Sequence, residues 1–323
     1  MVNRAVVSQF IVLGTTEFTL RCAQALLDSG AELRLLVSMP ERSRPINSAD
    51  VSGFAQSHKI LYHETEDINS PESLSAIKKQ QADYILASWP AIIKREVLGA
   101  ARMCIGSHPT DLPHNRGRHP LHWLITLGFK ESKLSFFRMN EGIDSGNILL
   151  KIPFRIGKKD SIMEVVAELN DAAYKGTKGL YRLLKRSVPE GTEQEHKEAN
   201  YWRKRSVHDV ILDLRMPSDT IIRTVRSFST PYPCAKLIFE DSIIAVSKAE
   251  VAQTPLSKEE IMRTEPGKII SAEGKRMLVK SEDKIMLLET DGLPQKILEA
   301  KYIHPPSKYI AGWSQNQLKR LEN

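Results

Sequence analysis

The stretch from Cys104 to Pro120, CIGSHPTDLPHNRGRHP, combines groups that carry protons with groups that restrict the backbone. Pro109 and Pro113 limit φ, and Gly117 permits close approach of another segment, so the pattern predicts a rigid turn. An imidazole can donate or accept a proton near neutral pH. A histidine held in a rigid turn is therefore a candidate for general acid–base catalysis. The turn contains three histidines, His108, His114 and His119.

The elements that must hold this turn belong to an α/β sheet. Its preceding residues, RMCIGS (102–107), read as a buried strand, and similar apolar runs occur at 9–13, 33–37 and 83–88. Segments with helix-start and helix-stop residues separate these runs, of which 15–30 is the clearest. Strands that alternate with helices predict a mostly parallel sheet. The turn then lies at the carboxyl end of a central strand, where such sheets bind ligands.

The rest of the chain predicts a second domain of a different class. A long amphipathic helix over 161–186 ends in a polar segment, and short β-like runs follow it at regular spacing. We expect an α/β, Rossmann-like, mostly parallel N-terminal domain and a small β-barrel (OB-like) C-terminal domain. The predicted boundaries are 1–186 for the catalytic domain, 187–206 for a linker and 207–323 for the second domain.

Composition places the chain among globular proteins with a mildly basic surface. Of its 323 residues 41% are hydrophobic and 26% are charged, and the formal net charge is +7. The three cysteines are widely spaced and form no metal-binding cluster, so we expect a cytoplasmic protein without a metal. The first 14 residues are too short to span a membrane and contain no cleavage site, and they read as a buried strand.

Two motifs in order resemble one enzyme family. SHPTDLPHNRGRHPLHW, followed by MNEGIDSGNIL (139–149), is similar to the His-Pro-Ser/Thr-x-Leu-Pro-x-x-Arg-Gly and Gly-x-Asp-x-Gly elements of the N10-formyltetrahydrofolate-dependent formyltransferases. SDTIIRTVRSFSTPYPCAKLIF (218–239) resembles the start of the C-terminal domain found in some members. The resemblance covers nearly the whole chain and implies an enzyme that uses N10-formyltetrahydrofolate.

The resemblance implies a catalytic pair, His108 and Asp144. When an amine attacks a formyl carbon, an oxyanion forms and the amine proton must reach the leaving nitrogen, and an imidazole can serve both needs. Asp144 would orient that ring and favour its charged form. The family usually has an asparagine two residues before the histidine, but this chain has Gly106, so one oxyanion donor is missing. Three side chains, or an ordered water, could replace it: Ser107, Thr110 and Asn115.

The resemblance also implies binding residues. The loop after the 83–88 strand and the backbone around 139–144 would hold the folate, with Trp89 and Ile92 lining the pterin slot. We predict five folate-binding residues, Trp89, Ile92, Met139, Ile143 and Asp144. For the acceptor we predict Asn115 and Arg116, although Arg116 serves a structural ion pair equally well. His114 and His119 read as packing or surface residues.

The acceptor is the open question. The residues RGRHPLHW are more like the branches that formylate amino sugars and other small amines. Other features suit initiator tRNA: the net positive charge, the Arg-bearing loop at 38–50 and the C-terminal domain. We expect a nucleotide-linked amino sugar or another small amine, with tRNA as the alternative. Gly106 leaves a second alternative, an inactive folate- or nucleotide-binding homologue. We expect no membrane partner, and the sequence leaves open whether the protein forms a homodimer.

Overall fold

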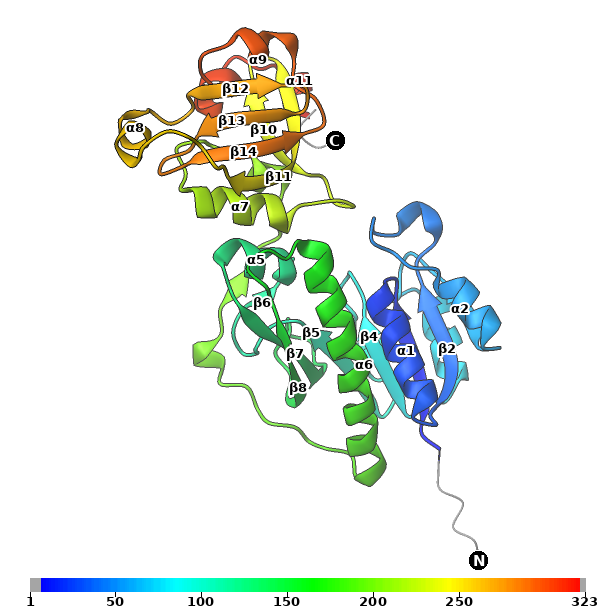
Figure 1. The fold of residues 1–323 in the computed structure, drawn as a ribbon. Helices are drawn as coiled ribbons and strands as arrows, with labels where there is room; N and C mark the ends of the chain where they lie inside the picture. The colour runs from blue at the N-terminus through cyan, green and yellow to red at the C-terminus, as the bar shows by residue number, and fades with distance from the viewer. Residues whose placement is uncertain (1–6, 320–323) are drawn as a thin grey trace, which may run out of the picture. The chain divides into compact units, whose positions relative to one another are not determined.

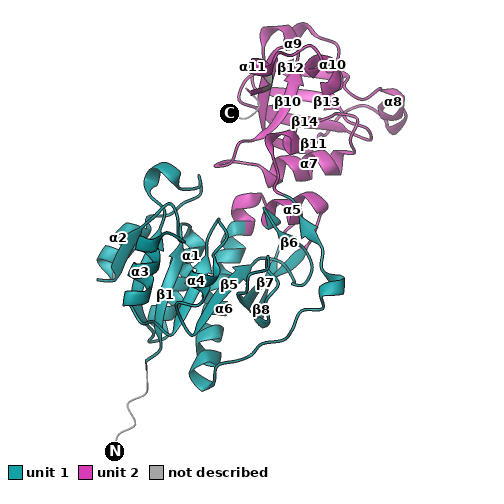
Figure 2. Cartoon of the chain, turned by 180° about the vertical axis from the view of Figure 1, so that it is seen from behind, with its two compact units in different colours: residues 1–120, 131–156, 166–203 teal, residues 121–130, 157–165, 204–323 magenta. Residues whose placement is uncertain are grey.

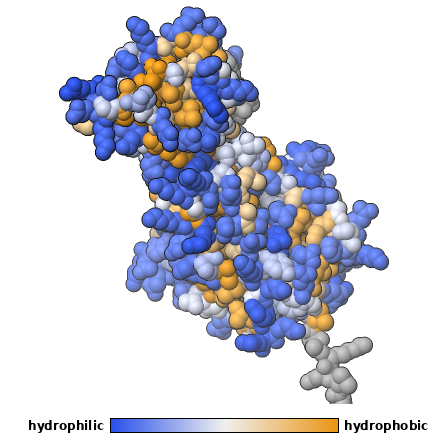
Figure 3. Space-filling view, in the orientation of Figure 1, coloured by the Kyte–Doolittle hydropathy of each residue, from blue (hydrophilic) through white to orange (hydrophobic). Residues whose placement is uncertain are grey.

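The computed structural model describes residues 7–319, which divide into two compact units (Figure 2). Unit 1 comprises 1–120, 131–156 and 166–203, and unit 2 comprises 121–130, 157–165 and 204–323. Residues 1–6 of the predicted first strand lie outside the described part. In the view of Figure 3 hydrophilic residues cover much of each unit, and hydrophobic residues reach the surface in smaller groups.

Unit 1 is built on a seven-stranded sheet with the order β3-β2-β1-β4-β5-β7-β8 (Figure 1). The first five strands in this order are parallel to one another, and β7 runs antiparallel to both β5 and β8. The strands are β1 (Gln9–Gly14), β2 (Glu32–Ser38), β3 (Leu61–Glu64), β4 (Tyr84–Ser88), β5 (Met103–His108), β7 (Glu131–Arg138) and β8 (Ile148–Arg155). A two-stranded ribbon pairs β6 (Arg116–Gly117) with β9 (Tyr201–Trp202).

The helices of unit 1 form where the sequence places their caps and apolar faces. Ser70 caps α3 by accepting from the Ser73 backbone N–H, with Pro71 in the first turn. The helix α1 lies beside α6 across one face of the sheet (Figure 1), and the Tyr174 hydroxyl of α6 donates to Asp28 of α1 over 2.6 Å. The helices are α1 (Glu17–Asp28), η1 (Glu41–Ser43), α2 (Val51–Ser57), α3 (Pro71–Lys79), α4 (Arg95–Leu98), α6 (Ile162–Arg186, which begins in unit 2) and η2 (His196–Glu198).

The strand order of unit 1 creates a switch point between β1 and β4. The chain moves from β1 to β2 on one side, and later returns to place β4 on the other side. The strands here are buried on both faces, as the burial of Phe10 to Leu13 shows. Loops that leave the carboxyl ends of β1, β4 and β5 therefore diverge at one edge, which can hold a ligand.

Unit 2 contains a five-stranded antiparallel sheet with the order β10-β11-β14-β13-β12. Its core includes Ile221 of α7 and, from the sheet, Val246, Met286 and Leu288, all of them fully buried. The elements are α5 (Pro120–Leu127), η3 (Val207–Val210), α7 (Ser218–Ser227), β10 (Ala235–Phe239), β11 (Ser242–Val251), α8 (Lys258–Arg263), β12 (Ile269–Glu273), β13 (Arg276–Lys280), β14 (Ile285–Thr290), α9 (Gln295–Glu299), α10 (Pro306–Ile310) and α11 (Gln315–Lys319).

The predicted fold class is confirmed: a mostly parallel Rossmann-like sheet precedes a domain of antiparallel strands. The predicted domain boundaries stay a prediction. The segment expected to be a featureless linker carries structure, because Thr192 bridges to Ile148 and the β9 strand pairs with β6. Within 7–319 no helix combines the length and apolarity needed to cross a bilayer. The described residues also contain no cluster of three or more metal-ligating side chains.

Candidate active site

His108 ends β5 and lies between a backbone carbonyl and a carboxylate. Its ring is 5% exposed, and Nε2 is 2.8 Å from the carbonyl oxygen of Asn115. Because a carbonyl oxygen only accepts, Nε2 carries the hydrogen of this bond. Nδ1 faces Asp144 Oδ2 at 3.4 Å. The two residues that the sequence pairs across separate loops therefore meet in space.

The orientation of the ring determines which nitrogen can exchange a proton. Nε2 is engaged by Asn115, so Nδ1 can gain or lose a proton without breaking that bond. Both ring nitrogens of His108 face acceptors, the Asn115 carbonyl and the Asp144 carboxylate.

Asp144 is held by its own loop and by the turn that follows β5. Its backbone has φ of 48°, in the left-handed region that aspartate tolerates better than most residues. Oδ2, the same oxygen that faces His108, accepts from the Gly117 backbone N–H at 3.0 Å. A Cβ on Gly117 would lie 2.4 Å from the carbonyl oxygen of Trp202, and φ there is +104°, so only glycine fits.

The turn itself is fixed by hydrogen bonds rather than by its prolines alone. The Thr110 hydroxyl donates to the carbonyl of His114 at 2.9 Å, and the Ser135 hydroxyl of β7 donates to the Thr110 carbonyl at 2.7 Å. Lys151 of β8 contacts the Asp111 carboxylate and donates to the Leu112 carbonyl at 2.6 Å. The rigidity predicted from sequence thus depends on β7, which pairs with β5, and on β8, the next strand in the sheet.

Asp111 carries the electrostatic part of this anchoring. Partial burial raises the pKa of its carboxyl, but hydrogen bonds from Lys151 and Lys133 outweigh that effect, so the pKa lies below its ordinary value. The carboxylate is consequently the stable form at neutral pH, and it ties the turn to β7 and β8.

A pocket of about 420 Å³ opens beside the pair at the carboxyl edge of the sheet. The volume is within the range of small-molecule sites. Its apolar wall includes Trp89, Ile93, Phe137 and Met139, and its polar wall includes Ser107, His108, Arg118 and Asp144. The pocket thus combines an apolar wall with the His108–Asp144 pair on its polar side.

The structure places the predicted folate residues unequally. Trp89, Met139 and Asp144 line the pocket, and their binding of folate stays a prediction. Ile92 does not, because its side chain is 72% exposed and its carbonyl accepts from Asn69. The adjacent Ile93 is buried and lines the wall. A loop has no side-chain period, so the sequence could not tell which of the two isoleucines faces inward. Ile143 is 55% exposed and lies outside the lining as well.

The two predicted acceptor residues lie behind the pocket. Arg116 is 1% exposed, and its guanidinium donates to the Gln194 side-chain oxygen at 2.7 Å and the Tyr201 hydroxyl at 2.9 Å. Asn115 supports His108 through its carbonyl. Arg118, two residues later in the chain, is exposed and lines the pocket. Arg116 in β6 is thus turned inward, and Arg118 is the arginine of this motif on the pocket wall. The role of Arg116 in acceptor binding stays a prediction.

Gly106 is a packing position as well as a missing donor. A Cβ there would lie 2.7 Å from a ring carbon of Phe137 and 2.9 Å from Met139 Cγ. The space that an asparagine side chain would enter is thus occupied. Of the predicted replacements, Thr110 is committed to backbone carbonyls and Asn115 to Asn200, which leaves Ser107 on the pocket wall.

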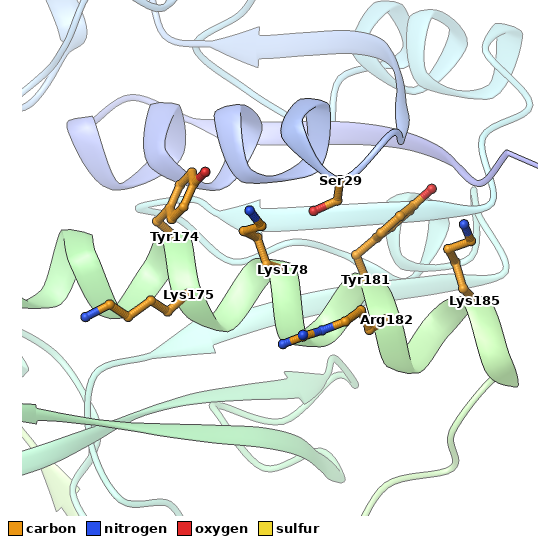
Figure 4. Close-up of a pocket in the computed structure, with 7 residues that line it drawn as sticks. All are labelled: Ser29, Tyr174, Lys175, Lys178, Tyr181, Arg182 and Lys185. Carbon is orange, nitrogen blue, oxygen red and sulfur yellow. The ribbon is translucent and has the colours of Figure 1, made fainter.

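A second hollow of about 530 Å³ lies along α6, beside the end of α1 (Figure 4). Since α1 runs back from the carboxyl edge, its last residues lie toward the amino ends of the strands, opposite to the pocket. The hollow is lined by cations and two tyrosine rings. Lys178 lies over the Tyr174 ring at 5.2 Å, and Lys185 over Tyr181 at 5.6 Å. No acid–base pair lines it.

A mostly parallel sheet with a histidine–carboxylate pair beside a pocket at its carboxyl edge is an arrangement that α/β enzymes use. Comparison with known proteins gives the family. Residues 8–179 match the family described as "Formyl transferase", and residues 205–302 match "Formyl transferase, C-terminal domain". The chain therefore belongs to the formyl transferase family, whose members are folate-dependent enzymes that use N10-formyltetrahydrofolate.

Relatives within the family differ in the acceptor that their names state. The chain is 24% identical to a methionyl-tRNA formyltransferase of Alkaliphilus oremlandii (strain OhILAs) over 287 residues, which are 87% of this chain and 90% of the relative. WlaRD, a sugar 3N-formyl transferase solved with dTDP and 5-N-formyl-THF, aligns over 89% of this chain and 99% of its own, with a TM-score of 0.65 and 15% identity. HypX from Aquifex aeolicus, in complex with tetrahydrofolic acid, aligns over 94% of this chain with a TM-score of 0.64 and 14% identity. This chain spans about half of the HypX chain, 47%.

Proposed function

We propose that this protein transfers a formyl group from N10-formyltetrahydrofolate to the primary amine of a small molecule, with a nucleotide-linked amino sugar as the first candidate. The observation that carries the proposal is the convergence of His108 and Asp144, 3.4 Å apart, on the wall of a pocket of small-molecule size. Both side chains also anchor the turn, His108 through the Asn115 carbonyl and Asp144 through the Gly117 N–H, but neither bond requires the ring and the carboxylate to face each other beside a hollow.

In this proposal His108 manages the proton of the attacking amine. N10-formyltetrahydrofolate, when bound, supplies the activated formyl group. His108 exchanges the proton at Nδ1 while Nε2 stays bonded to the Asn115 carbonyl, which keeps the ring plane fixed. Asp144 orients the ring and stabilises its charged form. Ser107 is the side chain on the pocket wall that replaces the missing asparagine as a hydrogen-bond donor.

The pocket suits the folate on its apolar side. Trp89, Ile93 and Met139 offer a flat surface against which a pterin ring can pack. The Met139 backbone N–H already donates to the Cys104 carbonyl, so that wall is fixed by the β5 strand before any ligand arrives. A preformed wall lowers the cost of binding because fewer groups must become ordered.

Arg118 favours an acceptor that carries negative charge. Its guanidinium is exposed and lines the pocket, where a planar fork can bind a phosphate or carboxylate in a bidentate manner. A nucleotide-linked amino sugar contains both the amine and the phosphates. The test is formyl transfer to a panel of amino-sugar nucleotides and free amino sugars. If transfer to the nucleotide-linked forms does not exceed transfer to the free sugars, this acceptor class is wrong.

Methionyl-tRNA is the second candidate acceptor. It is supported by the 24% identity to a methionyl-tRNA formyltransferase over most of both chains, and by the match in both domains. Binding to charged initiator tRNA with a steep decrease in affinity as salt rises, together with transfer, favours this reading, since neutralised phosphates release counterions. Folate binding without transfer to any acceptor on the panel favours an inactive homologue. The reason to consider one is Gly106, which takes the place of the family's usual asparagine.

A further inference from the structure

We propose that Gln194 is a positioning residue for formyl transfer, and that the segment 192–202, here called the strap, sets the geometry between His108 and Asp144. The inference rests on the proposed function. The strap follows α6 in the chain, and its sequence, TEQEHKEANYW, contains none of the residues that suggested catalysis. Its side chains nevertheless contact both loops of the candidate active site.

The Gln194 amide joins those loops directly. Its side chain is buried, and the residue is 3% exposed. The Nε2 group donates to the carbonyls of Asp144 at 2.9 Å and Gly146 at 2.7 Å. The Oε1 atom accepts from Arg116 Nε at 3.2 Å and from its terminal nitrogen at 2.7 Å. Both hydrogens and both lone pairs of the amide are used, so one side chain ties the Asp144 loop to the His108 turn.

The chemistry of these four bonds requires an amide. A carboxylate at position 194 would still accept from Arg116, but it has no hydrogen to offer the carbonyls of Asp144 and Gly146. Two carbonyl oxygens would then face a negative oxygen at hydrogen-bond distance. Gln194→Glu is therefore an isosteric change that keeps the Arg116 side of the bridge and breaks the Asp144 side.

A second contact of the strap acts on His108 from behind. Asn200 accepts from the Asn115 backbone N–H at 2.8 Å and donates to the Asn115 side-chain oxygen at 3.0 Å. The Asn200 carbonyl also accepts from the Arg116 N–H at 3.0 Å. These bonds hold the peptide whose carbonyl binds His108 Nε2. The strap therefore positions both partners of the pair, Asp144 through Gln194 and His108 through Asn200.

We expect loss of the Gln194 bridge to affect the rate of transfer more than the stability of the fold. The His108–Asp144 separation of 3.4 Å leaves little room for drift before the carboxylate stops orienting the ring. Displacements of about 1 Å at a catalytic group can lower rates roughly 100-fold. Loss of the Gln194 bridge should thus lower kcat while the apolar wall of the pocket, and with it folate binding, stays intact.

The experiment compares Gln194→Glu and Gln194→Ala with Glu193→Gln, which exchanges acid and amide on the exposed neighbouring residue. We expect kcat to decrease roughly 10- to 100-fold in both Gln194 variants, with little change in the KM for folate and none in the control. The pH profile of kcat should shift in Gln194→Glu, because the carboxylate of Asp144 moves relative to the ring. A lower melting temperature with an unchanged kcat and pH profile would mean a structural role only, and would overturn the proposal.

A readout without turnover separates this inference from the proposed function. The ¹⁵N chemical shifts of the His108 ring report its protonation and hydrogen bonds in the free protein, whether or not any acceptor is formylated. We expect these shifts and their pH dependence to change in Gln194→Glu and not in Glu193→Gln. Unchanged His108 signals in a folded Gln194→Glu variant contradict the positioning role. Changed signals without transfer by the wild type support the role and reject the function.

Discussion

The two hollows of unit 1 differ in how their residues come together. The pocket beside His108 collects side chains from the ends of β4, β5 and β7 and from the turns after them. The hollow on α6 takes all but one of its lining residues from a single helix, at the spacing 174, 175, 178, 181, 182 and 185 (Figure 4). The first contains opposing groups at short distance, and the second contains charges of one sign over a row of turns.

This difference indicates which of the two hollows is suited to group transfer. Catalysis needs a proton acceptor, a group that orients it and a wall for the ligand, and these face one another only when separate segments converge. The residues that α6 contributes to its hollow are four cations and two tyrosines, with no carboxylate to orient a proton acceptor. The larger hollow is therefore the weaker candidate for the reaction, and volume alone does not rank the sites.

The largest effect should come from His108→Ala. Removal of the imidazole takes away the proton exchange at Nδ1, and general acid–base catalysis typically contributes about 10²- to 10⁴-fold. We expect kcat/KM for transfer to decrease by that factor, with folate binding retained. His208→Ala, on an exposed residue of unit 2, serves as the control. Equal rates in the two variants would remove the basis for preferring this pocket.

Asp144→Asn should have the next largest effect. The amide keeps the size of the carboxylate and an oxygen for the Gly117 N–H, but it loses the charge that orients His108. Loss of such a supporting contact typically costs 10- to 100-fold. Steady-state rates over a range of pH will show whether the decrease is greatest where the imidazole is charged in the wild type. A uniform, small decrease would reduce Asp144 to a loop anchor.

Gly106→Asn tests whether the pocket can regain the usual family residue. Because Phe137 and Met139 fill the space, we expect a loss of about 1–3 kcal/mol in unfolding free energy from overpacking and no gain in transfer rate. Adding Phe137→Leu should recover part of the stability. Denaturant unfolding and transfer assays on the single and double variants measure both quantities. A faster and equally stable single variant would show that the wall yields easily.

Asp111→Asn tests how much the ion pairs that anchor the turn contribute to stability, and how that contribution depends on pH. The folded-state pKa of this carboxyl is lowered, so its contribution to stability is fully present above the unfolded value of 3.8 and is lost as pH falls through the folded value. The carboxylate is partly exposed, so we expect a loss of no more than about 1 kcal/mol at neutral pH. Urea unfolding at a series of pH values should show that the wild type and Asp111→Asn differ in unfolding free energy at neutral pH. The two values should become equal below the folded-state pKa of Asp111. A constant difference would exclude the ion pairs as its source.

The smallest effect should come from the hollow on α6. Reversing Lys178 and Lys185 to glutamate removes two cation–π contacts on a surface that takes no part in the proposed reaction. We expect transfer to a small amine to stay within about twofold of the wild type, as for most surface changes. Matched reversal of Lys78 and Lys79 on the exposed face of α3 gives the baseline. A loss of transfer in the α6 variant but not in the α3 variant would contradict this prediction and would show that the two hollows are functionally linked.

Much of the framework was predictable because it is local. The apolar runs at 9–13 and 83–88 became β1 and β4, and Ser161 to Arg186 became α6, within a residue or two at each end. The period of apolar residues and the capping chemistry act over one segment at a time. The pairing of His108 with Asp144 was predictable only from the resemblance to the family motifs, because His108 ends β5 whereas Asp144 lies in the loop between the antiparallel strands β7 and β8.

The sequence by itself determined the fold class and the family, and it singled out His108 and Asp144, which lie 3.4 Å apart in the structure. Only the tertiary structure decided which side chains face the pocket, as Ile93 and Arg118 do in place of Ile92 and Arg116. It alone also brought Gln194 and Asn200 to the two loops. The physical reason is that side-chain direction in loops has no repeating period, and contacts across about 80 residues depend on the packing of the whole sheet.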